Sequence, residues 1–355
     1  MTTRLGQPGF VCKGAAVPRA VRPVVALGAV ALLAAACGGG GGGGSASKRA
    51  PSTTAPATTA SSAPATTSAG ALRITPASWK LPAPSAREVA LSDGKQLVVL
   101  GGLDASRQTT GNIVRVDPSN GASQTLGSLV QPVHDAAGAF VNGAYLVIAG
   151  GTGEEGSASV QSFQPGSPVK AAGNLPGPLS DHVAVTIGNK VYVVGGFDGH
   201  QISRNVLVSD DGAQYRTLGA LAEPVRYPAV AATGGAIYVF GGVVNASGSD
   251  TRSIQKIDPG TGQVTVVGQL PAPLSHASAV EVGGRIYVAG GFVSNQVTGQ
   301  VLQFDPTRGS VSPAGSLPTP VTDGAATNIG DSAYLVGGQG TDRAPVATVV
   351  ELKVG

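Results

Sequence analysis

Cysteine is nearly absent from this chain of 355 residues, which has only Cys12 and Cys37, both close to its start. From residue 71 onward there is none, so a disulfide or a thiol nucleophile is excluded there and redox chemistry is not expected. Long apolar runs are also missing beyond the N-terminal region, where none approaches the ~20 residues that a membrane-spanning helix needs. Any membrane anchor is therefore expected near the N-terminus.

Acidic residues are missing from the first 73 positions, which hold seven of the 23 basic residues and none of the 20 acidic ones. The rest of the chain carries 16 basic and 20 acidic residues, a net charge of −4, although the whole chain has +3. A nucleic-acid-binding domain would show a basic stripe or face. The charge distribution therefore predicts no nucleic-acid partner.

The N-terminal region has the layout of a secretory signal, in which basic residues precede the apolar run 24–36. The string LLAAAC, which ends at Cys37, resembles the lipobox of bacterial lipoproteins and implies lipidation of Cys37. Alanine stands at position 34, where leucine is usual, so ordinary secretory cleavage or an uncleaved anchor are alternatives. We expect a signal peptide over residues 1–36. The protein is then extracytoplasmic, anchored to the membrane through Cys37 or secreted if the motif is not used.

Residues 37–70 have almost no apolar bulk: seven glycines follow Cys37, and Ser, Thr, Ala and Pro dominate the rest. This composition predicts a disordered tether. At ~5–6 Å times the square root of its length, such a segment reaches about 30 Å. It would hold a folded domain clear of a membrane surface.

Helix-period segments are missing after the leader, and a repeat takes their place. A Gly-Gly pair recurs at a regular interval six times, with spacings of 49, 45, 46, 49 and 47 residues, at 101–102, 150–151, 195–196, 241–242, 290–291 and 337–338. Short apolar runs such as 191–194 and 286–289 precede them, as expected for strands covered on both faces. One supersecondary unit is thus repeated six times over residues 71–355.

Each unit also contains strings that predict tight turns and a crowded inner strand. DPSNG, DPGTG and DPTRG place proline early and glycine late, which predicts a hairpin between the last two strands of a unit. Segments rich in Ala, Gly, Ser and Val, such as 229–232 and 277–280, suit strands beside a central axis. Four antiparallel strands per unit and six units predict an all-β, six-bladed β-propeller.

The repeat resembles the kelch family, because the double glycine follows an apolar strand, a tyrosine often stands three places before it, and Asp-Pro hairpins follow. These tyrosines, Tyr192, Tyr238, Tyr287 and Tyr334, are expected to pack between blades. The tryptophan that kelch repeats usually carry on the outer strand is absent, since the only one is Trp79. The sixth unit lacks its fourth strand at the C-terminus. Residues 72–75 are expected to supply that strand and close the ring.

Loop lengths separate the two ends of the predicted propeller. The turns between the first and second strands are tight, whereas those between the second and third are long and varied, and binding residues concentrate on such loops. Polar residues at the start of each inner strand should ring the channel mouth at the long-loop end. The ring consists of Arg87, Asp135, Asp181, Tyr227, His276 and Asp323, flanked by Glu88, His134, His182 and Arg226.

In kelch proteins this rim commonly binds the partner or substrate, so the resemblance implies a non-catalytic module for an envelope or extracellular protein or a glycan. The same residues could instead satisfy turn backbone groups and line a water-filled channel. A third alternative is a sugar epimerase of the sialic-acid epimerase type, using Asp181, His182 and Arg226. A copper-radical oxidase of the galactose oxidase type is excluded, because it needs a cysteine in the domain. The histidines and carboxylates have no defined ligand spacing, so neither a metal nor a cofactor is expected.

Overall fold

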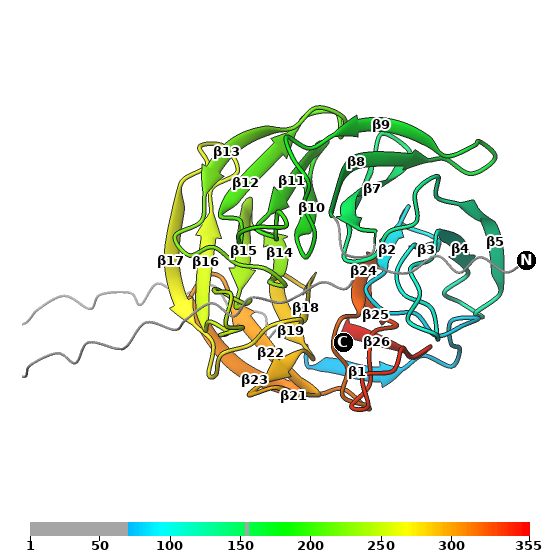
Figure 1. Cartoon of the computed structure of the whole chain (residues 1–355). Helices are drawn as coiled ribbons and strands as arrows, with labels where there is room; N and C mark the ends of the chain where they lie inside the picture. The colour runs from blue at the N-terminus through cyan, green and yellow to red at the C-terminus, as the bar shows by residue number, and fades with distance from the viewer. Residues whose placement is uncertain (1–69, 153–155) are drawn as a thin grey trace, which may run out of the picture. The chain divides into compact units, whose positions relative to one another are not determined.

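The computed structural model describes residues 70–152 and 156–355. The predicted signal peptide, 1–36, and tether, 37–70, lie outside these ranges apart from Gly70. The described residues form six four-stranded antiparallel sheets and one two-stranded hairpin, arranged as a ring (Figure 1). Within them, no helix is long and apolar enough to cross a membrane. The predicted six-bladed propeller is confirmed.

The blades follow one another along the chain, and each runs from an inner to an outer strand. Blade 1 contains β2 (Val89–Ser92), β3 (Leu97–Leu100), β4 (Asn112–Val116) and β5 (Ser123–Ser128). Blade 2 contains β6 (Ala137–Val141), β7 (Ala144–Gly151), β8 (Gly156–Phe163) and β9 (Lys170–Asn174). Blade 3 contains β10 (Val183–Ile187), β11 (Lys190–Val194), β12 (Asn205–Ser209) and β13 (Arg216–Ala220).

The second half of the ring repeats this pattern, with one small addition. Blade 4 contains β14 (Ala229–Thr233), β15 (Ala236–Phe240), β16 (Ser253–Ile257) and β17 (Val264–Gln269). Blade 5 contains β18 (Ser278–Val282), β19 (Arg285–Ala289), β22 (Gln300–Asp305) and β23 (Ser310–Ser316), and its long loop carries the hairpin β20 (Phe292–Val293) and β21 (Gln296–Val297). Blade 6 contains β24 (Ala325–Ile329), β25 (Ser332–Val336) and β26 (Val349–Val354).

Blade 6 is completed by β1 (Leu72–Pro76), which pairs antiparallel with β26 from Leu72 opposite Val354 to Pro76 opposite Val350. This confirms the predicted closure by the N-terminal strand. Trp79 follows β1 and secures the seam: its indole Nε1 donates to the Pro118 carbonyl of blade 1 at 2.8 Å, and its ring lies 6.2 Å from that of Tyr334 in blade 6. The single tryptophan therefore joins the first and last blades.

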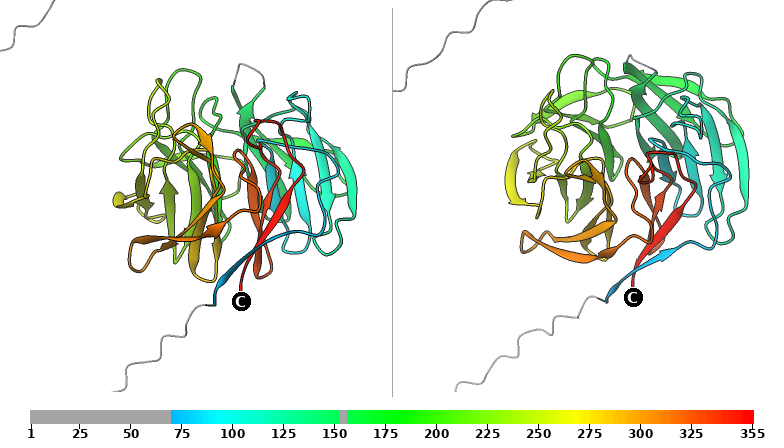
Figure 2. Two further views of the ribbon diagram at one scale, coloured as in Figure 1. Left: turned by 90° about the horizontal axis from the view of Figure 1, so that it is seen from below. Right: turned by 60° about the horizontal axis from the view of Figure 1, so that its bottom comes forward.

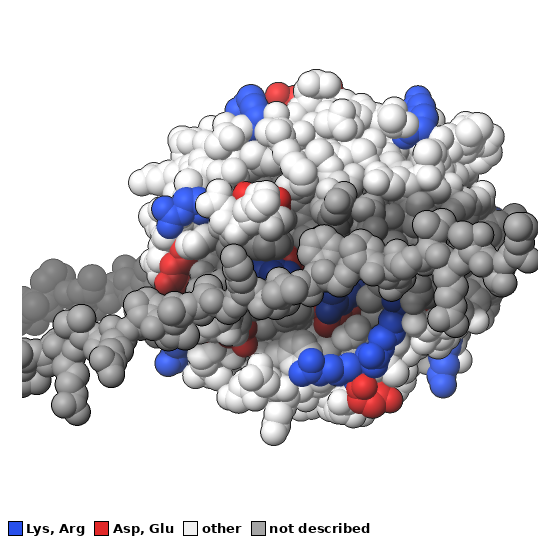
Figure 3. All heavy atoms as spheres, in the orientation of Figure 1, with Lys and Arg blue, Asp and Glu red and all other residues white. Residues whose placement is uncertain are grey.

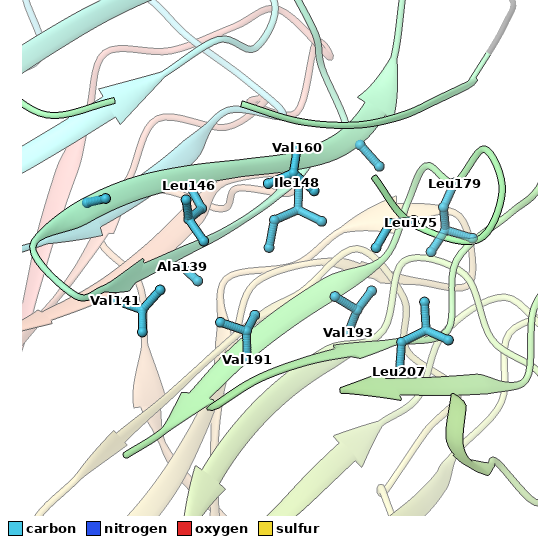
Figure 4. Close-up of a cluster of buried hydrophobic side chains, with 12 residues drawn as sticks. Ala139, Val141, Leu146, Ile148, Val160, Leu175, Leu179, Val191, Val193 and Leu207 are labelled. Atoms are coloured by element: carbon cyan, nitrogen blue, oxygen red, sulfur yellow. The ribbon is translucent and has the colours of Figure 1, made fainter. Parts of the chain in front are cut away.

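Apolar contacts between neighbouring blades form the core. Figure 4 shows this between blades 2 and 3, where the side chains of two blades face each other: Val141, Leu146 and Ile148 on one side and Val191, Val193 and Leu207 on the other. All six are buried. Burying one such side chain stabilises a fold by about 1.5–3 kcal/mol. Contacts of this kind between neighbouring blades hold the inner strands at a constant separation around the axis.

The Asp-Pro hairpins have the predicted geometry. In the hairpin of blade 1, the Gly121 amide donates to the Asp117 carbonyl at 2.8 Å, and Gly121 has a φ of 77°. Gly262 and Gly309 repeat this bond and this left-handed conformation in blades 4 and 5. These turns bring the two outer strands of a blade together in few residues.

The register of blade 2 differs from the sequence prediction. In the other five blades, both residues of the Gly-Gly pair have positive φ, but in blade 2 these conformations belong to Ala149, at 56°, and Gly150, at 102°. The hydrogen-bond pattern agrees, because the second residue of each pair donates to the loop before the next blade, and in blade 2 this donor is the Gly150 amide. The Gly150–Gly151 pair is thus one residue late, since an alanine occupies the first left-handed position.

Candidate functional site

The predicted ring residues meet around one end of the central axis. Each occupies the same place in its blade, just before the inner strand, and each amide donates to the carbonyl of its counterpart in the preceding blade. The six N–H···O distances lie between 2.8 and 3.1 Å, and the Arg87 amide closes the cycle by donating to the Asp323 carbonyl. The members are Arg87, Asp135, Asp181, Tyr227, His276 and Asp323. We call this cycle the mouth ring.

All six residues of the mouth ring have a left-handed backbone, with φ between 51° and 59°. For a residue with a β-carbon this conformation costs roughly 1–2 kcal/mol, a cost that glycine avoids. The chain has glycine at many other left-handed positions, but at none of these six. The side chains are thus held at the ring at an energetic cost.

The residue before each ring member is also held in place. It forms an antiparallel bridge to the residue that follows the left-handed pair in its own blade, as in Ser180 with Phe197 and Arg226 with Val243. Backbone bonds therefore fix the ring both around the axis and within each blade. Preorganised side chains of this kind need little reordering when a ligand binds.

A central cavity of about 490 Å³ runs from the mouth ring along the inner strands. Its walls are the inner strands of all six blades and consist mostly of Ala, Val, Gly and Ser, as predicted for strands that crowd an axis. Charged side chains of both signs are visible in the hollow in the middle of the face in Figure 3. The site is thus a recessed, largely apolar chamber with a polar entrance, which is typical of small-ligand sites.

One charged network spans blades 1, 2, 5 and 6. Arg87 Nη1 donates to Asp135 Oδ2 at 2.9 Å, and its Nε lies 3.8 Å from Asp323 Oδ1. His276 Nδ1 lies 2.7 Å from the same Asp323 oxygen. The Arg87 side chain is 25% exposed, whereas those of Asp135 and Asp323 are 9% and 3% exposed. The carboxylates thus lie beneath the guanidinium group, which is the part that a ligand can reach.

A second group lies across blades 3 and 4. Arg226 Nη2 forms an ion pair with Asp181 Oδ2 and donates to the Tyr227 hydroxyl at 3.2 Å. The guanidinium lies over the rings of Phe197 and Tyr227, 4.5 and 4.8 Å from their centroids. Again the arginine is the more accessible partner, with 27% of its side chain exposed against 3% for Asp181.

Aromatic faces connect the two groups. The Tyr227 and His276 rings are stacked, with centroids 3.8 Å apart and planes at 21°. His276 in turn contacts Phe292 edge to face at 5.2 Å. Such pairs contribute about 0.5–1.5 kcal/mol beyond their buried area. The mouth therefore presents planar apolar faces beside hydrogen-bonding groups.

Burial raises the pKa of every acidic group at the ring, but at Asp323 other contacts outweigh it. It raises the pKa of Asp135 to about 7, against the opposing charge of Arg87, and that of Glu88 to about 8. Burial also raises the pKa of Asp181 despite the charge of Arg226. For Asp323, burial acts in the same direction, but the contacts with His276 and the charge of Arg87 outweigh it and lower the pKa. Asp135 and Glu88 thus titrate near neutral pH, where an acid or base of catalysis would need to act.

The flanking histidines differ in their access to the cavity. His134 is partly exposed, its Nδ1 lies 2.8 Å from the Thr109 hydroxyl oxygen and its Nε2 lies 3.7 Å from Asp135 Oδ2. His182 is only 4% exposed, and its Nε2 lies 3.1 Å from the Ile148 carbonyl oxygen. Burial lowers the pKa of His182 to about 4, so the ring is neutral at pH 7. His182 lines the cavity, and His134 does not. The acid or base role of His182 stays a prediction, and its Nε2 is engaged by the Ile148 carbonyl.

Phe197 and Phe292 also belong to the site, although sequence reasoning did not include them. Each directly follows a Gly-Gly pair, at a position that bridges to the residue before a ring member. The aromatic residue directly after the Gly-Gly pair was the sequence signal that could have identified both as site residues. The Gly-Gly pairs predict only where strands end and assign no role to the residue that follows them.

Comparisons with known proteins agree with this architecture. The Kelch motif matches residues 178–208, 224–271 and 273–318, which fall in blades 3, 4 and 5. No curated protein sequence matches the chain. Among solved structures, that of YjhT is similar, with a TM-score of 0.68, 15% sequence identity, and coverage of 78% of this chain and 99% of the other. At this identity the likeness concerns the fold. Six closed four-stranded blades and Kelch motifs in three consecutive blades show that residues 71–355 form a six-bladed β-propeller with kelch repeats, which supports a binding or scaffold module.

Proposed function

We propose that the protein is an extracytoplasmic glycan-binding module whose site is the mouth ring and the cavity behind it. The observation that carries the proposal is the left-handed backbone at all six ring positions without a single glycine. Backbone strain that is retained in a well-packed structure clusters at functional sites. At this ring the strain holds two acidic-basic pairs and a stacked aromatic pair around one opening.

A glycan suits this chemistry better than a protein surface does. The cavity is recessed and holds about 490 Å³, which accommodates a small ring or the end of a chain rather than a flat partner. Sugar hydroxyls both donate and accept hydrogen bonds, and the mouth offers guanidinium donors at Arg87 and Arg226 beside carboxylate acceptors. The stacked rings of Tyr227 and His276 add apolar surface beside these polar groups, which suits the C–H groups of a sugar ring.

The point where the chain enters the propeller supports a tethered arrangement. Because β1 pairs antiparallel with β26, Leu72 lies opposite Val354, at the end where the tight hairpins gather. Figure 2 shows the start of β1 beside the C-terminus, at the edge of the propeller away from the long loops. The chain thus enters the propeller at the end opposite the mouth ring, which leaves the long-loop end free of this connection.

A sugar epimerase or mutarotase is the second candidate, and the raised pKa of Asp135 favours it. Proton transfer at a sugar needs an acid or base that titrates near the working pH, and burial raises the pKa of Asp135 to about 7. Glu88, with a pKa of about 8, lines the same cavity. In this mechanism Asp135 would exchange the proton, and Arg226 with Asp181 would hold the sugar.

A glycan-binding screen with ring variants tests the proposal. Tyr227→Gly and Asp181→Gly remove side chains while suiting the left-handed backbone, so the fold should persist. We expect the wild-type protein to bind a defined set of glycans and both variants to lose at least about tenfold in affinity. Equal binding by wild type and variants would refute the ring as the site.

Anomeric exchange followed by NMR, with Asp135→Asn as the test variant, separates catalysis from binding.

A further inference from the structure

The long loops of blades 1 and 6 present two arginines that the mouth ring does not use. Arg107 and Arg343 are exposed, and each has a left-handed φ of 60°. Within the part of the chain that the structure describes, neither forms an ion pair, in contrast to Arg87 and Arg226. These two exposed guanidinium groups thus have no carboxylate partner among the described residues.

The two loops are built alike. Each is a five-residue turn closed by a backbone bond, from the Asp104 amide to the Gln108 carbonyl at 3.0 Å and from the Gly340 amide to the Ala344 carbonyl at 3.0 Å. In each, the arginine amide donates to the first residue of the turn, at 2.8 Å for Arg107 and 2.9 Å for Arg343. The corresponding left-handed position in the loop of blade 4 is Gly248, with a φ of 79°. Arginine therefore occupies a position for which glycine is the unstrained choice.

The carboxylates nearest in sequence are engaged within the loops. Asp104 Oδ1 accepts from the Ser106 and Gln108 amides at 2.8 and 3.0 Å. Asp342 Oδ1 accepts from the Ala344 amide at 2.9 Å. These bonds shape the turns and keep those carboxylate oxygens on the backbone.

The two arginines lie together and next to the mouth ring. Arg107 Nη2 donates to the Arg343 carbonyl at 3.0 Å, which joins the loops of blades 1 and 6. The Arg343 guanidinium lies 5.2 Å from the centroid of the Phe292 ring. Phe292 contacts the ring residue His276 edge to face, so a continuous path of contacting groups leads from Arg343 to the cavity mouth.

From this juxtaposition we propose an outer anion-binding subsite, formed by Arg107 and Arg343, for an acidic group on a polysaccharide whose end occupies the mouth ring. The inference rests on the proposed glycan-binding function and names the substrate class as an acidic polysaccharide, bearing carboxylate or sulfate. Guanidinium groups suit both anions because they donate two parallel hydrogen bonds. Phe292 offers a face along which the chain passes from the subsite to the ring.

The test measures affinity for polygalacturonate oligomers, dextran sulfate and neutral dextran. The paired variant Arg107→Gly with Arg343→Gly removes both charges at positions that favour glycine, so folding should be unaffected. The control pair, Lys95→Gln with Arg308→Gln, removes the same charge from tight turns at the opposite end of the propeller. We expect one or both acidic polymers to bind better than dextran, and the subsite variant to lose about five- to tenfold in affinity for that polymer. The control variant should behave as wild type.

Each remaining outcome decides a separate claim. Equal affinity for acidic and neutral polymers, or loss of acidic binding in the control variant as well, would overturn the subsite. Acidic binding that disappears in Tyr227→Gly but persists in the arginine variant would overturn the subsite and leave the glycan function standing. If the subsite variant loses acidic binding while Tyr227→Gly retains it, the subsite is supported and the mouth ring is refuted. Loss for polygalacturonate alone would assign the subsite to carboxylates, and loss for dextran sulfate alone to sulfates.

Discussion

His276 Nδ1 lies 2.7 Å from Asp323 Oδ1, and the Asp323 amide donates to the His276 carbonyl at 3.1 Å. The two neighbours in the mouth ring are thus joined through both backbone and side chain. The contact with His276 and the charge of Arg87 lower the pKa of Asp323 even though burial alone would raise it. This pair makes the acid stability of the propeller depend on a residue of the proposed binding site.

Replacing His276 should therefore change the acid limb of the stability profile, which is the fall in the free energy of unfolding as the pH decreases. A carboxylate whose folded-state pKa is lowered stabilises the fold above its unfolded pKa, and this stabilisation is lost as the pH falls through the folded value. In His276→Ala, the Asp323 pKa should rise toward its unfolded value, so the variant should lose stability near neutral pH and its acid limb should become shallower than in wild type. Urea unfolding between pH 2 and 7 measures this. The double variant with Asp323→Asn should show no such shift, and an unchanged acid limb in His276→Ala would contradict the assignment.

Glu88 should have the opposite effect at high pH. Burial raises its pKa to about 8, so the unfolded chain releases a proton near pH 4.5 while the folded state keeps it. The contribution of Glu88 to the free energy of unfolding is fully favourable below the unfolded pKa and is lost as the pH rises toward 8. Glu88→Gln should thus stabilise the protein at pH 9 by about 2–4 kcal/mol and have little effect at pH 4. Denaturant unfolding at the two pH values tests this, and equal effects at both would contradict the raised pKa.

The ring position of Tyr227 should reverse the usual ranking of glycine and alanine. Both substitutions remove the side chain, but only glycine adopts a φ of 52° without cost. Tyr227→Gly should therefore be more stable than Tyr227→Ala by about 1 kcal/mol. Ala231→Gly in strand β14 is the control, since glycine should be the less stable residue there. Thermal unfolding of the three variants measures both differences.

The seam between the first and last blades should depend on Trp79. Trp79→Ala removes the hydrogen bond to Pro118 and the packing against Tyr334, so we expect a loss of about 3–5 kcal/mol. Trp79→Phe keeps most of the packing and should lose only about 1 kcal/mol with the hydrogen bond. Because the chain has one tryptophan, its fluorescence reports opening of this seam. A fluorescence transition that precedes loss of the β-sheet signal in circular dichroism would show that the ring opens there first.

The shifted register of blade 2 makes position 149 a site of stabilisation. Ala149 has a φ of 56°, where the other five blades have glycine, so Ala149→Gly should raise stability by about 1 kcal/mol. Gly195→Ala, at the same position in blade 3, should be destabilising, because its β-carbon would lie 2.4 Å from the Val225 carbonyl oxygen. Denaturant midpoints of the two variants compare them directly. A destabilising Ala149→Gly would argue for the register of the sequence prediction.

Much of the fold could be predicted because its signals are local and repeated. A strand between glycines, an Asp-Pro hairpin and a missing last strand each depend on a few adjacent residues, and six copies make the pattern hard to mistake. The ring residues could be located in the same way, because each stands at the start of the inner strand of its blade. The prediction for blade 2 was one residue out, because Gly150–Gly151 looks like the other Gly-Gly pairs in the sequence. Only the φ angles and the hydrogen bonds show that Ala149 takes the first left-handed position.

The amino-acid sequence by itself determined the number of blades, the strand that closes the ring and the residue that each blade contributes to the mouth, because strand period, turn chemistry and spacing are properties of neighbouring residues. Only the tertiary structure decided which arginine meets which carboxylate, that His182 is buried against Ile148 while Arg87 and Arg226 stay accessible, and that Phe292 links Arg343 to the ring. These contacts join residues from different blades. Their geometry depends on how closely the apolar faces of neighbouring blades pack, which no local pattern encodes.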